Sequence, residues 1–183
     1  MSAMEYDRFK PQLREMIREI YDDLEKDVDV VVIEGAGSPA EINLKEGDIV
    51  NMSMAKSADA PVILIGDINP GGVFASLYGT VKLLDEDEQK RIKGLVINKF
   101  RGDVKILEPG LKMIEDLLGI PVIGVIPWMD IDLEDEDSVT ERFTQRSGKG
   151  QIRTAIVPVA SFASNAWIIL LLIGFFLNMI GLV

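Results

Sequence analysis

Short apolar runs alternate with amphipathic stretches along the first 130 residues, and this alternation limits the fold more than any other feature of the sequence. The apolar runs cover about residues 28–33, 61–66, 94–97 and 122–126. Helical periodicity marks about residues 6–26, and further helical patterns follow at about 51–57, 73–93 and 106–118. Such alternation is typical of βαβ units, so we expect an α/β protein with a doubly wound, mostly parallel sheet.

The composition excludes several kinds of chemistry. The 183 residues include no Cys and no His, which excludes a thiol nucleophile, an imidazole base and a zinc site of the usual ligand types. A metal would be held by oxygen, and Mg²⁺ is the natural candidate. The net charge of −11 argues against a nucleic-acid surface, which needs a basic stripe.

The first apolar run ends in Glu34, which Gly35, Ala36 and Gly37 follow. In parallel sheets, ligands bind beyond the carboxyl ends of the strands. A carboxylate beside glycines suits a Mg-nucleotide, because glycine lets the backbone approach a phosphate closely. The same residues also fit a plain chain turn, and the motif alone does not decide between the two readings.

Two further strand ends carry polar groups. Asp67 precedes a Pro-Gly-Gly turn at residues 70–72 that opens a predicted helix, whose N-terminus could bind an anion. An ordinary Pro-Gly turn is the alternative reading. Asn98 and Lys99 follow the third run, and an asparagine amide offers the donor and acceptor that adenine requires. As a bare dipeptide, Asn98-Lys99 carries little information.

Several longer strings, taken together, are far more specific. They are VVIEGAGSPAEINL (31–44), DIVNMSMAKSADAPVILIGDI (48–68), GGVFASLYGT (71–80), INKFRGD (97–103), LEPGL (107–111) and GIPVIGVIPW (119–128). In this order and spacing they resemble the cobyric acid synthase family, glutamine-dependent amidases of cobalamin biosynthesis whose N-terminal domain is similar to dethiobiotin synthetase. The resemblance covers about residues 6–139.

The resemblance implies a P-loop NTPase-like domain that uses ATP and Mg²⁺ to phosphorylate side-chain carboxylates of a corrinoid, adenosylcobyrinic a,c-diamide. Ammonia then displaces the phosphate to form the amides of adenosylcobyric acid. By position, Glu34 resembles the Mg²⁺ ligand, Asp67 would lie near the metal as a second catalytic carboxylate, and Asn98 with Lys99 would contact the nucleotide. The residues implied on the corrinoid and phosphate side are Gly35, Ala36, Gly37, Ser38, Glu41 and Asn43.

The chain also departs from the family pattern. No GxxxxGK[ST] motif occurs in it, and Asn69-Pro70 stands where an Asp-Arg pair is expected. Without Cys and His, glutaminase chemistry of the family's kind is excluded. We therefore expect a domain that lacks the family's first strand and P-loop, with unpaired backbone beside the strand at 28–33. Catalysis would need a separate P-loop segment and a glutaminase domain, so whether this chain is itself an enzyme stays open.

The last thirty residues, 154–183, carry no charged side chain. We divide the chain into a partial ATP-amidoligase domain (1–140), a basic linker and strand (141–162) and a hydrophobic tail (163–183). The tail is predicted to form a helix that just reaches membrane-spanning length. Basic residues in the linker would keep the acidic body in the cytoplasm. The alternative is that the tail has no selected role.

Two other functions fit parts of the sequence. One is a non-catalytic, tail-anchored protein that keeps the fold for contacts with other proteins. The other is a regulator of the MinD or ParA kind. The string SPAEIN at residues 38–43 favours the corrinoid family over this regulator.

Overall fold

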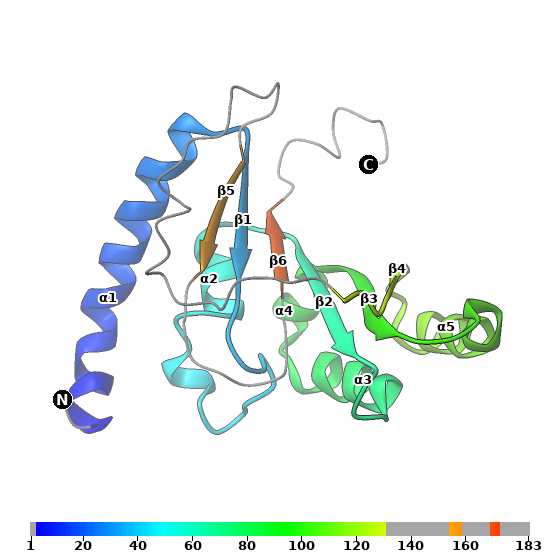
Figure 1. Ribbon diagram of the computed structural model, residues 1–183. Helices are drawn as coiled ribbons and strands as arrows, with labels where there is room; N and C mark the ends of the chain where they lie inside the picture. The colour runs from blue at the N-terminus through cyan, green and yellow to red at the C-terminus, as the bar shows by residue number, and fades with distance from the viewer. Residues whose placement is uncertain (1–2, 131–153, 159–168, 173–183) are drawn as a thin grey trace.

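The computed structural model describes residues 3–130, 154–158 and 169–172 (Figure 1). Helices and strands alternate through the first part, as the sequence predicts. The elements in chain order are α1 (Ala3–Leu24), η1 (Glu25–Asp27), β1 (Val30–Glu34), η2 (Lys45–Gly47), α2 (Met52–Ser57), β2 (Val62–Asp67), α3 (Val73–Leu83), α4 (Glu86–Arg91), β3 (Ile92–Phe100), α5 (Val104–Leu118), β4 (Val122–Pro127), β5 (Thr154–Pro158) and β6 (Ile169–Leu172).

The strands form two three-stranded sheets, ordered β5-β1-β6 and β2-β3-β4. All pairs in the second sheet are parallel, and β1 pairs with β5 in parallel. The prediction of an α/β fold with a parallel sheet is confirmed. The strand β6 departs from it, because it runs antiparallel to β1.

The strand β6 also corrects two expectations. We expected a helix across 163–183 and unpaired backbone beside β1, but Ile169–Leu172 form a strand that pairs with Val31–Glu34. Figure 1 shows β6 between β1 and β2. A segment of apolar residues can pair with the edge of a sheet as readily as it can form a helix, because either structure gives hydrogen-bond partners to its backbone N–H and C=O groups. No helix in the described ranges is long and apolar enough to cross a bilayer. The rest of the predicted tail and the linker at 141–153 lie outside the described residues.

The prediction of a single helix over residues 73–93 is wrong, because the structure has two helices there, α3 and α4. Leu84 adopts an extended backbone (ψ 154°), and Asp85 begins α4 with a capping box. In this box the Glu88 carboxylate accepts the Asp85 N–H at 3.0 Å. The Glu88 side chain, only 6% exposed, also pairs with Lys45 at 2.9 Å and with Lys56 at 3.2 Å. The hydrogen bonds of this capping box thus begin α4 directly after the extended residue that ends α3.

The core lies between the strands and the helices that cover them. Ile33 of β1 and Leu95 and Ile97 of β3 are fully buried, and Tyr21 of α1 packs into the same cluster. Gly66 in β2 lets α3 approach closely, because a Cβ built there would lie 2.7 Å from Val73 Cγ2. The glycine thus sets the distance between α3 and the strand that carries Asp67.

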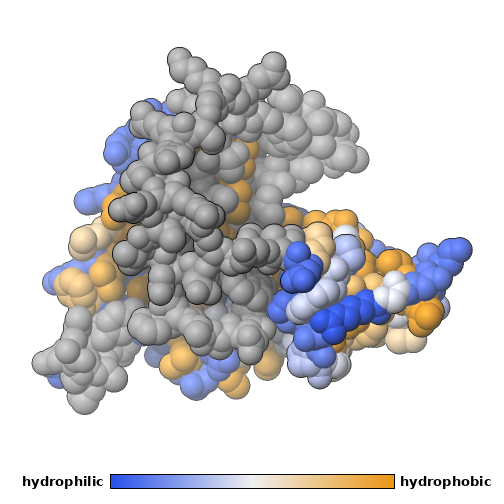
Figure 2. All heavy atoms as spheres, in the orientation of Figure 1, coloured by the Kyte–Doolittle hydropathy of each residue, from blue (hydrophilic) through white to orange (hydrophobic). Residues whose placement is uncertain are grey.

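Hydrophobic side chains also reach the surface. Figure 2 shows some of them beside hydrophilic residues at the end of the molecule formed by α5. Among them, Ile106 is 81% exposed, and Met113 and Leu117 are more than half exposed.

Candidate functional site

Three of the predicted site residues lie together at the carboxyl edge of the second sheet. The parallel register pairs Asp67, the last residue of β2, with Asn98 near the end of β3. Lys99 Nζ lies 2.6 Å from Asp67 Oδ2, and Asp67 Oδ1 accepts the Asn69 N–H at 2.8 Å. The sequence therefore places Asp67, Asn98 and Lys99 together, although it did not predict the ion pair.

The Asp67 carboxylate is largely enclosed, with 11% of its side chain exposed. Burial raises the pKa of Asp67, but the Lys99 ammonium and the Asn69 N–H both favour the carboxylate, and the pKa ends below its ordinary value. Asp67 is therefore ionised at neutral pH, and Lys99 balances its charge.

Lys99 holds its side chain in position through an uncommon backbone conformation. Its φ of +62° lies in the left-handed region, which a residue with a Cβ rarely adopts. The Asn98 side-chain oxygen accepts the Lys99 N–H at 2.9 Å, and the Asn98 carbonyl accepts the Ile68 N–H at 3.1 Å. These bonds support a strained turn at the strand end, a feature that clusters at functional sites.

An aromatic group, the indole of Trp128 directly after β4, borders this edge. The Trp128 N–H donates to the Phe100 carbonyl at 2.8 Å, so the ends of β3 and β4 stay paired. The Arg101 guanidinium lies 3.9 Å from the centre of the Trp128 ring, a cation–π contact. Trp128 is 44% exposed, so a flat, partly open indole stands one strand away from Asn98.

The end of β1 and the turn after it, residues 34–37, carry further predicted site residues, and we call this segment the Glu34 loop. The Asn51 side chain holds it through two bonds: Asn51 Nδ2 donates to the Ala36 carbonyl at 2.8 Å, and Asn51 Oδ1 accepts the Ala36 N–H at 3.0 Å. Asn51 is only 6% exposed. Because Asn51 takes the Ala36 N–H, that group is not a donor for a phosphate.

The remaining predicted residues follow the Glu34 loop. Gly37 has φ +64°, with open space where a Cβ would lie. The Ser38 hydroxyl accepts the Ala40 N–H at 3.2 Å, so it stabilises the local turn. Glu41 and Asn43 are exposed. No described contact joins these residues to Asp67 or Asn98, and their roles stay predictions.

Mg²⁺ would find few protein ligands here. In the described ranges, acidic side chains form no group of three or more that could hold a metal ion. The two predicted ligands, Glu34 and Asp67, each supply one carboxylate, and Lys99 already pairs with that of Asp67. One or two carboxylates still fit Mg²⁺ when substrate phosphates and waters complete its octahedron. These carboxylates would therefore fit Mg²⁺ only together with substrate phosphates and waters, and metal binding by Glu34 and Asp67 stays a prediction.

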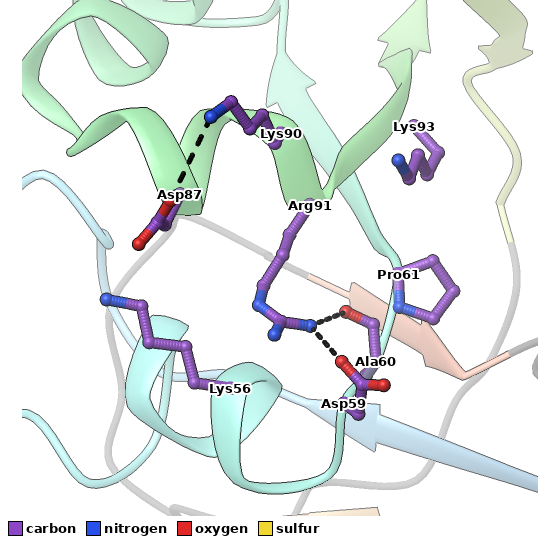
Figure 3. A pocket seen from close by; sticks show the side chains of 8 residues that line it. All are labelled: Lys56, Asp59, Ala60, Pro61, Asp87, Lys90, Arg91 and Lys93. Carbon is purple, nitrogen blue, oxygen red and sulfur yellow. Dashed lines mark hydrogen bonds and ion pairs between the residues drawn. The ribbon is translucent and has the colours of Figure 1, made fainter.

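A depression of about 620 Å³ lies at the opposite, amino end of β2 and β3 (Figure 3). Its lining includes Lys56, Lys90 and Lys93, together with Arg91, whose guanidinium lies 2.9 Å from Asp59 Oδ1. None of the predicted site residues lines it. The depression is thus separate from the carboxyl-edge site.

Polar side chains at the carboxyl edge of a parallel sheet place this protein in the class of α/β folds whose ligands bind at that edge. The comparison with known families agrees with this class. The chain belongs to the AAA domain family, which matches residues 2–136.

Comparison with individual proteins gives a more specific resemblance than the family does. The chain is 67% identical over 147 residues to the cobyric acid synthase of Alkaliphilus metalliredigens, a match that covers 80% of this chain and 29% of the relative. It is 57% identical over 157 residues to that of Caldanaerobacter subterraneus, covering 86% and 31% of the two chains. It is 61% identical over 139 residues to that of Yersinia enterocolitica, a match that covers 76% of this chain and 27% of the relative.

The resemblance to cobyric acid synthases is thus confirmed. The chain spans less than a third of the length of the relatives it matches. No solved structure matches it significantly.

Proposed function

We propose that this chain supplies the magnesium and adenine side of a cobyric acid synthase-type ATP site in cobalamin biosynthesis. In this proposal Glu34 holds Mg²⁺, Asn98 contacts adenine, and Asp67 with Lys99 borders the phosphates. The reaction served would be the ATP-dependent amidation of corrinoid side-chain carboxylates. The observation that carries the proposal is the pairing of Asp67 with Asn98 at one sheet edge, in a chain 67% identical to a cobyric acid synthase.

The charges at this edge support a phosphate ligand. The Asp67 carboxylate and the Lys99 ammonium balance each other, so the edge repels a polyanion less than the net charge of −11 suggests. The Trp128 indole carries Arg101 on one face and is 44% exposed, so its remaining surface would be available to a base. A nucleotide would therefore meet an amide, an aromatic face and an ammonium group along this edge.

Further polypeptide would complete the site. This sequence contains no GxxxxGK[ST] loop, whose backbone N–H groups and lysine grip the phosphates in P-loop proteins. We expect a P-loop segment to complete the ATP site and a glutaminase domain to provide ammonia. The finer fold assignment, a dethiobiotin synthetase-like P-loop domain with its sheet covered on both faces, belongs to the same proposal.

Calorimetric titration of Mg-ATP tests the proposal, with and without a P-loop segment supplied as a separate polypeptide. We expect negligible binding by the chain alone and clear binding after complementation. Glu34→Gln should weaken the complemented binding and its dependence on Mg²⁺, whereas Glu86→Gln, which alters an exposed carboxylate on α4, should not. Tight binding by the chain alone, or no binding in either case, would contradict the proposal.

A further inference from the structure

The Asn51 side chain is a buried polar group whose hydrogen bonds go to a single residue. Its amide donates to the Ala36 carbonyl and accepts the Ala36 N–H, at 2.8 and 3.0 Å. This paired arrangement fixes the amide orientation, because only one placement of its oxygen and nitrogen satisfies both groups. Ala36 lies 15 positions earlier in the chain, so the contact joins two separate segments.

A second observation singles out the same residue. Asn51 has φ −103° and ψ −109°, a backbone conformation outside the helix and strand regions. Uncommon backbone conformations persist only where the surroundings enforce them, and they cluster at functional sites. Asn51 directly precedes α2, so the turn there aims its side chain back toward the end of β1.

The surroundings of Asn51 enforce this turn. The Asp48 carboxylate accepts the N–H groups of Val50, Asn51 and Ser53, at 3.0, 2.9 and 2.9 Å. The Asp48 carbonyl in turn accepts from the Ser53 hydroxyl at 2.6 Å and from Arg14 of α1 at 2.8 Å. One continuous set of hydrogen bonds therefore links α1, the start of α2 and the Glu34 loop.

From these contacts we infer that Asn51 is the positioning residue of the nucleotide site, which holds the Glu34 loop in the conformation that presents Glu34 to the metal. The inference rests on the proposed function for the identity of the ligand. Asn51 does not touch the ligand itself. It acts through Ala36, two residues beyond the Glu34 carboxylate, by removing the freedom of a loop that contains two glycines.

Hydrogen exchange measures the positioning role without any ligand. Asn51→Leu keeps the branched shape of the side chain but leaves both Ala36 groups unpaired, and Asn51→Ala removes the contact and most of the side chain together. We expect the Ala36 amide to exchange roughly 10- to 100-fold faster in both variants, since two neutral hydrogen bonds are lost. Gln89→Leu is the matched control, because it removes another side-chain amide bond to a backbone carbonyl, that of Leu84 at 2.7 Å.

Mg-ATP binding by the complemented chain gives the second measurement. We expect Asn51→Leu to weaken this binding about tenfold or more, and Gln89→Leu to leave it unchanged at a similar melting temperature. Unchanged exchange at Ala36, or faster exchange with unchanged Mg-ATP affinity, would overturn the inference. If the unsubstituted complemented chain does not bind Mg-ATP, the proposed function fails, and the exchange result still decides whether Asn51 holds the loop.

Discussion

Replacing Gly66 by alanine should force β2 and α3 apart. A Cβ at Gly66 would lie 2.7 Å from Val73 Cγ2 and 3.1 Å from Leu77 Cδ2, whereas carbon atoms in contact lie about 3.5–4.0 Å apart. Val73 is β-branched and stiff, so the helix must shift or Val73 must leave its preferred rotamer. Overpacking of this kind costs about 1–3 kcal/mol.

Gly124 in β4 provides the matched control, because a Cβ there would meet no atom within 4 Å. Neither glycine has a positive φ, so alanine gains stability of roughly 0.5–1 kcal/mol at both positions, because it loses less backbone entropy than glycine on folding. This gain cancels in the comparison. We therefore expect Gly66→Ala to lower the free energy of unfolding by about 1–3 kcal/mol relative to Gly124→Ala.

Urea denaturation of both variants measures this difference. Val73→Ala removes the clashing methyl groups, so a double-mutant cycle with Gly66→Ala should show a favourable coupling of about 1–2 kcal/mol. Equal stability of Gly66→Ala and Gly124→Ala, or a coupling near zero, would refute the close-approach argument.

Two further predictions concern charged groups. Glu88→Gln should lower the free energy of unfolding by about 1–2 kcal/mol at pH 7, since the ammonium groups of Lys45 and Lys56 lose a buried carboxylate partner, whereas Glu86→Gln should have no effect. Burial raises the pKa of Glu88, but the bonds of its carboxylate to the Asp85 N–H and the two ammonium groups outweigh burial, and the pKa ends below its ordinary value. The stabilisation by Glu88 is therefore full at neutral pH and is lost as the pH falls through this lowered pKa. The difference between Glu88→Gln and the unsubstituted chain should therefore shrink in acid, and a constant difference would contradict this. Lys99→Met should raise the pKa of Asp67 in a carboxyl NMR titration, whereas Lys112→Met, which removes an exposed ion pair, should not; an unmoved Asp67 pKa would disprove the pairing.

The sequence predicted the strands and their polar ends well, because two independent signals agree there. The β-branched runs before Glu34 and Asp67 favour buried parallel strands, and the residues after such strands necessarily meet at one edge. The break between α3 and α4 had a readable signal in Asp85 and Glu88, spaced as in a capping box. The surrounding apolar pattern continued through it, and the prediction followed that pattern.

Other features depend on partners that a single sequence does not reveal. The apolar composition of Ile169–Leu172 suits a helix and a strand equally, and only the available edge of β1 decides between them. Asn51 was visible as a polar residue before α2, but its partner Ala36 belongs to another element. The ion pair of Asp67 with Lys99 likewise depends on the left-handed backbone of Lys99, and no glycine or asparagine at that position indicates such a conformation in the sequence.

The pairing of β1 has a consequence for the order of events during synthesis. Both neighbours of β1 come from the segment after residue 153, whereas β2, β3 and β4 pair through short local crossovers within residues 62–127. Contacts between distant residues form more slowly than local ones, because more chain entropy is lost on closure. On the ribosome, the sheet that contains Asp67 and Asn98 can therefore assemble while β1 still waits for residues 154–172 to emerge.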